Sequence, residues 1–161
     1  MRKEITEVAA MIECPQGYNH QLSYNQKEER FTLDRILLEG MVYPFDFGFI
    51  TDTITEHRIG SKIVLIADSG SYPGCLVKCR IVGSMQAEVV ECDGRNVYYE
   101  RLIGVPVSAA KFAGINHIGQ LSGHYLERLD DFFRSYNTMA AEPCKVMEMR
   151  STPAGGNLLT A

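Results

Sequence analysis

The feature that most constrains the fold is a change of hydrophobic period near residue 120. Before it, short runs rich in β-branched and aromatic residues alternate with Gly, Asn, Asp or Pro, which is typical of strands joined by turns. After it, GHYLERLDDFFRSYN places large apolar side chains at helical spacing. We therefore predict an α+β fold: an antiparallel, closed or nearly closed β-barrel with flanking helices.

The individual elements follow from the same pattern. Asp-Gly at 93–94 suits a tight turn and predicts a hairpin between its flanking runs. We expect a helix over 123–137 and a shorter one over 109–115. Strands are expected over 7–15, 20–25, 30–38, 61–68, 75–85, 87–94 and 95–107.

The length of 161 residues favours one domain, which we assign to 1–150. The segment 151–161 is small, polar and Gly-rich, so we expect a flexible C-terminal tail. The net charge of −4 argues against nucleic-acid and anionic-membrane partners. No apolar run is long enough for a membrane span, and the charged N-terminus does not resemble a signal peptide. With an odd count of five cysteines, these features predict a cytoplasmic protein with free thiols.

Several stretches, in a fixed order between residues 12 and 137, resemble the soluble inorganic pyrophosphatases. They are IECPQGYNHQLSYN, FTLDRILLEGMVYPFDFGFI, YPGCLVKCRIVG and DDFFRSYN. The resemblance implies an OB-like barrel and a cavity in which several Mg²⁺ ions assist the hydrolysis of diphosphate. It also implies a homo-oligomer, because bacterial members commonly form hexamers.

Some of the family's site positions keep their residue type. The opening strand retains Glu13, the second stretch retains Asp34, Arg35 and Tyr43, and the helix end retains Tyr136. Arg101 stands near a family Lys. By resemblance, these residues would face one cavity.

Other positions depart from the family. Where it has an Asp-Gly-Asp-Pro-x-Asp metal motif, this chain has HRIGSK, so that His57, Ile59 and Lys62 replace its three aspartates. A Lys within a few Å of a divalent cation is repelled by several kcal/mol even at an effective dielectric of about 20. Further replacements are Gln21 for a Lys, Ser23 for a Glu, Phe47 for a Tyr and Asn137 for a Lys.

These losses lead us to expect no metal cluster, no cofactor, and absent or weak pyrophosphatase activity. We therefore predict a repurposed enzyme of biosynthesis that performs metal-independent acid–base chemistry on a small organic molecule. Its candidate catalytic residues are His57, Lys62, Asp46, Asp34 and Glu13. Its candidate ligand-binding residues are Arg35, Tyr43, Tyr136, Arg101 and Phe47.

Two alternatives stay open. The first is a divergent Mg²⁺-dependent pyrophosphatase whose acids have moved to Glu88, Glu91, Asp93 and Glu100. The second is a non-catalytic binding or structural homologue. Each candidate residue also has a structural interpretation, such as ion pairing for the acids and core packing for the tyrosines.

Overall fold

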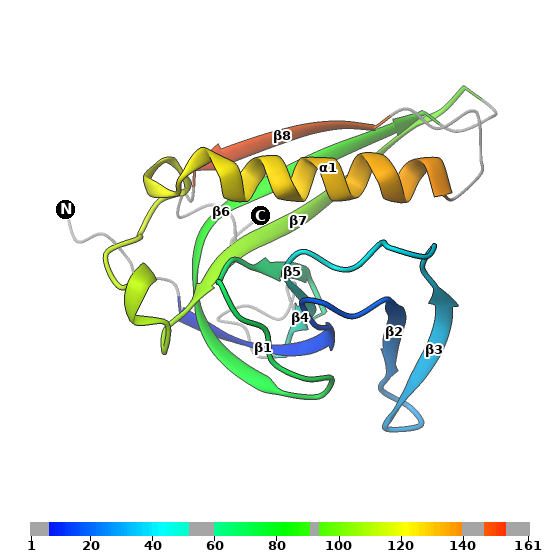
Figure 1. Ribbon diagram of the computed structural model, residues 1–161, viewed down its shortest axis with the longest axis horizontal. Coiled ribbons are helices and arrows are strands. Elements are labelled where there is room, and N and C mark those ends of the chain that lie inside the picture. The colour runs from blue at the N-terminus through cyan, green and yellow to red at the C-terminus, as the bar shows by residue number, and fades with distance from the viewer. Residues whose placement is uncertain (1–6, 52–59, 91–93, 140–146, 154–161) are drawn as a thin grey trace.

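The computed structural model describes residues 7–51, 60–90, 94–139 and 147–153 (Figure 1). Its long helix is α1 (Gly123–Met139), and the short 3₁₀ helices are η2 (Ala110–Phe112) and η3 (Ile118–Gln120). The strands are β1 (Glu7–Cys14), β2 (His20–Asn25), β3 (Arg30–Ile36), β4 (Asp46–Ile50), β5 (Lys62–Leu65), β6 (Leu76–Val90), β7 (Asn96–Pro106) and β8 (Met147–Pro153).

Most of the strands form one sheet that closes on itself. The order is β1-β4-β5-β7-β6-β8, and an additional β1–β6 pairing closes the barrel. The predicted barrel with a flanking helix is confirmed, with one difference. β5 and β7 run parallel, with Ile63 opposite Leu102, whereas the other pairs are antiparallel. Parallel neighbours need a crossover connection, and here β6 lies within that connection.

The described residues also change the bounds of several predicted elements. The two strands expected over 75–85 and 87–94 are one long strand, β6, because it pairs with β7 on one side and β8 on the other. The helix expected over 109–115 is only the single turn η2. Residues 151–153, expected in the tail, end β8, and 154–161 lie outside the described residues.

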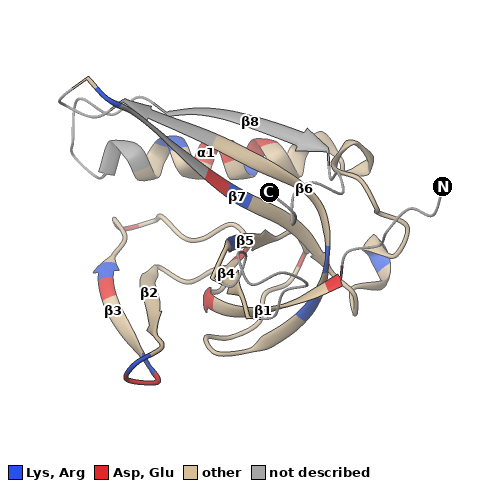
Figure 2. Cartoon of the chain, turned by 180° about the vertical axis from the view of Figure 1, so that it is seen from behind, with Lys and Arg blue, Asp and Glu red and all other residues tan. Residues whose placement is uncertain are grey.

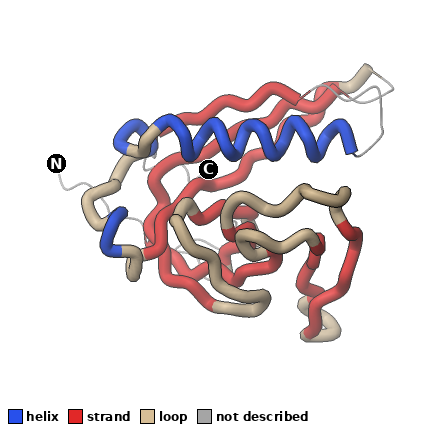
Figure 3. The backbone as a smooth tube through the Cα atoms, viewed as in Figure 1, coloured by secondary structure: helices blue, strands red, loops and turns tan. Residues whose placement is uncertain are grey.

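Helix α1 lies across the outside of the barrel (Figure 3). Its apolar face, which includes Tyr125, Leu129, Phe132 and Phe133, joins a buried cluster with side chains of β4, β5 and β7. A second buried cluster fills the barrel between β1, β5 and β6. No helix in the described part of the chain is long and apolar enough to cross a membrane.

The β2–β3 hairpin forms its own two-stranded sheet and stands apart from the barrel (Figure 1). Its tip carries a group of charged residues, whereas charges are sparse along the barrel strands (Figure 2). Aromatic rings join the hairpin to the barrel: Tyr24 stacks on Phe49 with 5.9 Å between ring centroids and contacts Phe31. The hairpin therefore forms a separate wall opposite α1.

Strands β1 and β4 approach each other very closely at Gly48. A Cβ on this residue would lie 2.1 Å from the Met11 carbonyl oxygen. Since no side chain tolerates such a contact with backbone, this spacing requires glycine.

Candidate functional site

A cavity of about 250 Å³ lies between the β2–β3 hairpin, the barrel strands and α1. It is smaller than the ~300–1,000 Å³ usual for drug-sized ligands, so its size suits a small polyatomic ion. Polar and aromatic side chains share its wall. The lining residues are Glu13, Cys14, Gln21, Leu22, Ser23, Asp34, Tyr43, Phe47, Gly48, Lys62, Arg101, Phe132, Phe133 and Tyr136.

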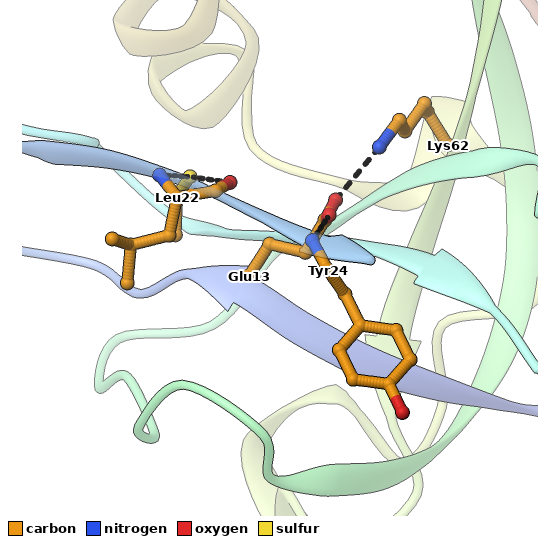
Figure 4. Close-up of polar contacts among 5 residues, drawn as sticks. Glu13, Leu22, Tyr24 and Lys62 are labelled. Carbon is orange, nitrogen blue, oxygen red and sulfur yellow. Dashed lines mark hydrogen bonds and ion pairs between the residues drawn. The ribbon is translucent and has the colours of Figure 1, made fainter. Parts of the chain in front are cut away.

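Glu13 enters this cavity from an irregular point of β1. Its neighbours Ile12 and Cys14 pair with the adjacent residues Gly48 and Phe47, so Glu13 is the extra residue of a β-bulge. Its Oε1 accepts from Lys62 Nζ at 2.7 Å and its Oε2 accepts from the Tyr24 backbone N–H at 2.8 Å. Figure 4 shows these two contacts side by side. The carboxylate is therefore buried, paired and fixed.

Asp34 reaches the cavity in the same way. On β3 it falls between Leu33 and Arg35, which pair with the adjacent residues Leu22 and Gln21, so Asp34 is also an extra residue. Unlike Glu13, Asp34 is exposed. Bulges redirect side chains next to binding sites. Here each of the two cavity carboxylates belongs to its own bulge, Glu13 on β1 and Asp34 on β3.

Arg101 supplies the cavity with a cation from β7. Its guanidinium lies 5.2 Å from the Phe47 ring centroid and 5.5 Å from that of Phe133. Desolvation beside these rings lowers the pKa of Arg101, although an Arg remains protonated at neutral pH. Among the described residues, this guanidinium makes no hydrogen bond or ion pair. It is a partly buried cation with open donors.

Two protonated groups lie beside Arg101. Burial raises the pKa of the Cys14 thiol, whose sulfur also contacts the Leu22 backbone N–H and carbonyl at 3.4 Å. Burial, with the neighbouring Cys14, raises the pKa of Tyr43. Both groups therefore keep their protons at neutral pH, and the Tyr43 hydroxyl is a donor rather than a base.

Tyr136 joins α1 to the hairpin across the cavity. Its hydroxyl donates to Gln21 Oε1 at 2.9 Å, and the Arg35 guanidinium lies 5.7 Å from its ring centroid. Arg35 is thus adjacent to the cavity, although it is not one of the lining residues.

Most of the predicted site residues line the cavity, whereas Arg35 is only adjacent to it. Asp46 lies outside the lining set, because its oxygens accept from the Gln16 and Ser71 backbone N–H groups and the Ser71 hydroxyl. This buried carboxylate holds two loops together. His57 lies outside the described residues.

Sequence reasoning missed several lining residues, notably Cys14, Gly48, Phe132 and Phe133. The helical spacing of Phe132 and Phe133 with Tyr136 was a usable signal, since it places all three near one face of α1. Nothing in the sequence indicated that Phe133 and Phe47 would both contact the Arg101 guanidinium.

Of the four relocated acids in the pyrophosphatase alternative, Glu100 is exposed and does not line the cavity. Glu91 and Asp93 lie outside the described residues, as does the side chain of Glu88. In the described ranges, no group of three or more His, Cys, Asp or Glu side chains is placed to hold a metal ion.

Comparison with known proteins gives one consistent family. The model of the family "Inorganic pyrophosphatase" matches residues 10–155. An inorganic pyrophosphatase of Synechocystis is 26% identical over 147 residues, covering 91% of this chain and 84% of the relative. One from Saccharolobus solfataricus is 28% identical, covering 89% and 81%. The crystal structure of the Thermus thermophilus enzyme superposes with a TM-score of 0.76 at 25% identity, covering 93% of this chain and 83% of that one.

These findings overturn the predicted function. The relatives, bacterial and archaeal, are named inorganic pyrophosphatases, so a repurposed, metal-independent reaction in biosynthesis is the wrong interpretation. The expectation of no cofactor is corrected as well, since the family points to Mg²⁺. The error was to infer a different reaction from the replacement of the family's metal-binding aspartates. Lys62 and Arg101 leave the cavity well suited to a phosphate ligand.

Proposed function

Since the chain belongs to the inorganic pyrophosphatase family, we propose that it binds diphosphate in this cavity and hydrolyses it with Mg²⁺, more slowly than its relatives. In the reaction, water attacks one phosphorus of P₂O₇⁴⁻ and the bond to the bridging oxygen breaks. Each HPO₄²⁻ product keeps one of the two water protons. The proposal rests on the hydrogen-bond donors that the cavity offers to phosphate and on the small number of carboxylates available to bind Mg²⁺.

Arg101 is the observation that carries the proposal. A partly buried guanidinium without an ion pair among the described residues loses hydration, and a ligand anion would compensate this loss. The planar fork of Arg matches phosphate oxygens and forms strong, charge-assisted hydrogen bonds. Contacts with the Phe47 and Phe133 rings restrict the position of the guanidinium before the ligand arrives.

Hydroxyl groups complete the phosphate site. Tyr43 stays protonated and is available as a donor near Arg101. Tyr136 donates to Gln21 in the described structure and can exchange that acceptor for a phosphate oxygen at similar energy. Together with Arg101, these groups bind and orient the ligand from the barrel and from α1.

The donor set fits a magnesium ion that arrives with diphosphate better than one held by the protein alone. Mg²⁺ is commonly bound by one or two carboxylates, waters and substrate phosphates. In the cavity, Asp34 is the exposed carboxylate that would hold it, because both oxygens of Glu13 already have partners. When bound, the ion neutralises phosphate charge and activates water.

The same shortage of carboxylates supports a low rate. Glu13 and Asp34 are the acids that line the cavity, and Lys62 offsets one of them. We expect turnover about 100-fold or more below that of the Thermus relative, equivalent to ~3 kcal/mol of lost transition-state stabilisation.

Phosphate release from diphosphate with excess Mg²⁺, measured beside the Thermus enzyme, tests the proposal. Slow release that is abolished by chelating Mg²⁺ and reduced in Asp34→Asn is the expected result. An exposed matched change, Glu39→Gln, controls for the loss of a carboxylate elsewhere. Equal rates in the two enzymes would contradict the low rate. No release and no diphosphate binding would contradict the function.

We also propose a homo-oligomer, a hexamer by family resemblance, in the cytoplasm. The hairpin and its exit expose Leu33, Ile36 and Leu38, each more than half exposed, which is consistent with a subunit contact. The described cysteines, Cys14, Cys75 and Cys79, are free thiols, as in reducing compartments. Light scattering after size exclusion gives the subunit number.

A further inference from the structure

The Lys62–Glu13 pair is an ionic contact inside the cavity. Lys62 begins β5 opposite Phe49 of β4, and its ammonium lies 5.8 Å from the Phe49 ring centroid. Its Nζ is 2.7 Å from Glu13 Oε1. Both side chains line the cavity together with Ser23 and Asp34.

Glu13 holds Lys62 from a rigid position. The Glu13 side chain is only 8% exposed, and its second oxygen accepts from the Tyr24 backbone N–H. Figure 4 shows Glu13 between Lys62 and Tyr24. If Glu13 turned to a metal ion, it would leave the Tyr24 N–H and a nearby ammonium without partners, which is unfavourable. Glu13 is therefore better placed to orient Lys62 than to bind a metal.

Lys62 has capacity for a ligand. An ammonium carries three N–H donors, and Glu13 accepts one of them in the described part of the chain. The Lys62 side chain is 49% exposed, so its remaining donors reach the open cavity. The Phe49 ring lies on its other side and offers no hydrogen-bond acceptor of comparable strength.

The charge of Lys62 decides what binds next to it. A fixed ammonium repels a divalent cation and attracts a phosphate oxygen. We propose that Lys62 Nζ donates to a phosphate oxygen of bound diphosphate, supplying positive charge that the ligand would otherwise bring as Mg²⁺, and that Glu13 is its positioning residue. This inference rests on the proposed function. It assigns Lys62 to binding, alongside Mg²⁺, and gives it no part in proton transfer.

Binding without turnover tests the assignment. Imidodiphosphate, which has NH in place of the bridging oxygen, is titrated calorimetrically into each variant at limiting and at excess free Mg²⁺. The set comprises wild type, Lys62→Met, Glu13→Gln, their double variant, Arg101→Met and Lys78→Met. Lys78 is an exposed Lys of β6 outside the cavity, so its change is a matched loss of charge.

We expect Lys62→Met to weaken binding about 30-fold at limiting Mg²⁺ and clearly less at excess Mg²⁺, where a further ion takes over the charge. Glu13→Gln should weaken binding about 3-fold in the wild type and have no further effect in the Lys62→Met background. Lys78→Met should bind as wild type does. Thermal unfolding and circular dichroism verify that each variant is folded.

Contrary results separate the two proposals. If Arg101→Met loses binding but Lys62→Met does not, the role of Lys62 is wrong and the diphosphate site stands. A Lys62→Met loss that is equal at both Mg²⁺ levels contradicts the replacement of metal charge. Additive losses from Glu13 and Lys62 contradict the positioning role. If wild type does not bind imidodiphosphate at all, both proposals fail.

Discussion

Arg80 and Arg101 occupy paired strands of one barrel but have opposite surroundings. Arg80, on β6, donates to the carbonyl oxygens of Ile115 and Phe112 at 2.8 Å each, and to that of Ala113 at 3.4 Å. Arg101, on β7, lies against two neighbouring phenyl rings and makes no hydrogen bond or ion pair to a described residue.

The difference separates a structural cation from a binding one. Arg80 fixes the backbone between η2 and η3, and its hydrogen-bonding capacity is spent on carbonyl groups. Arg101 contacts phenyl rings, which accept no conventional hydrogen bond and so leave its N–H donors available. A cation with open donors marks the site more sharply than a buried charge alone.

The largest expected effect is on the structural side of this comparison. Arg80→Met removes the donor to the Ile115 carbonyl and one of the two donors to the Phe112 carbonyl, and should lower the free energy of unfolding by ~3 kcal/mol. Denaturant titration measures this change. Imidodiphosphate affinity of the folded variant should stay within 2-fold of wild type, roughly the scatter of such comparisons. A large loss of affinity at full stability would break the comparison.

Arg101→Met should show the reverse pattern. We expect imidodiphosphate affinity to fall about 30- to 100-fold, equivalent to ~2–3 kcal/mol, while the melting temperature stays equal or rises. The rise is expected because a partly buried cation without an ion pair to a described residue is removed. Arg128→Met is the matched control, since Arg128 lies 4.8 Å from the Phe45 ring centroid outside the cavity. A comparable affinity loss in that control would point to general charge rather than to Arg101.

A smaller effect is expected at Tyr136, whose hydroxyl has a partner. Tyr136→Phe removes the hydrogen bond to Gln21 and a donor for phosphate, so KM for diphosphate should rise about 5-fold, equivalent to ~1 kcal/mol. Gln21→Met removes only the protein acceptor and should raise KM less. Steady-state kinetics at fixed Mg²⁺ separates the two. Equal effects would assign Tyr136 to joining the hairpin to α1 alone.

The smallest expected effect on stability is at Asp68, an exposed carboxylate whose two oxygens both accept hydrogen bonds. Lys111 and Tyr125 donate to Asp68, and these hydrogen bonds, that of Lys111 foremost, lower the pKa of its carboxyl. A lowered pKa stabilises the fold above the unfolded value of about 4, and this contribution is lost as pH falls through the folded value. Asp68→Asn should therefore lower the melting temperature slightly at pH 7 and not below about pH 3. A difference that persists in acid would contradict the linkage.

Much of the fold was predictable because local pattern and tertiary structure agree. The bounds of β2 match the prediction, and the helical spacing over 123–137 is α1. The elements that were predicted incorrectly depend on pairing between segments distant in the sequence. The last three residues of β8 were expected in the tail because the Gly-rich sequence there hides a strand that pairing with β6 specifies. The short Phe-rich β4 lacked turn signals of its own and became a strand through β1 and β5.

The candidate site was predictable in its residues and not in their roles. Glu13, Asp34 and Lys62 do come together, but the two bulges that turn the acids inward arise from register shifts that no single strand reveals. Asp46 looked equivalent to Glu13 in sequence, and only the positions of Gln16 and Ser71 in the fold show that both of its oxygens are occupied. The function was mistaken because lost acids were weighed more heavily than retained cations.

The contact at Gly48 has a consequence for how this site can diversify. Any side chain there would clash with the Met11 carbonyl and force β1 away from β4. Glu13 on β1 would then move away from Phe47 on β4. The β1–β4 side of the cavity is therefore fixed by the backbone. A relative that evolves to bind a larger ligand must instead change the β2–β3 hairpin or the end of α1.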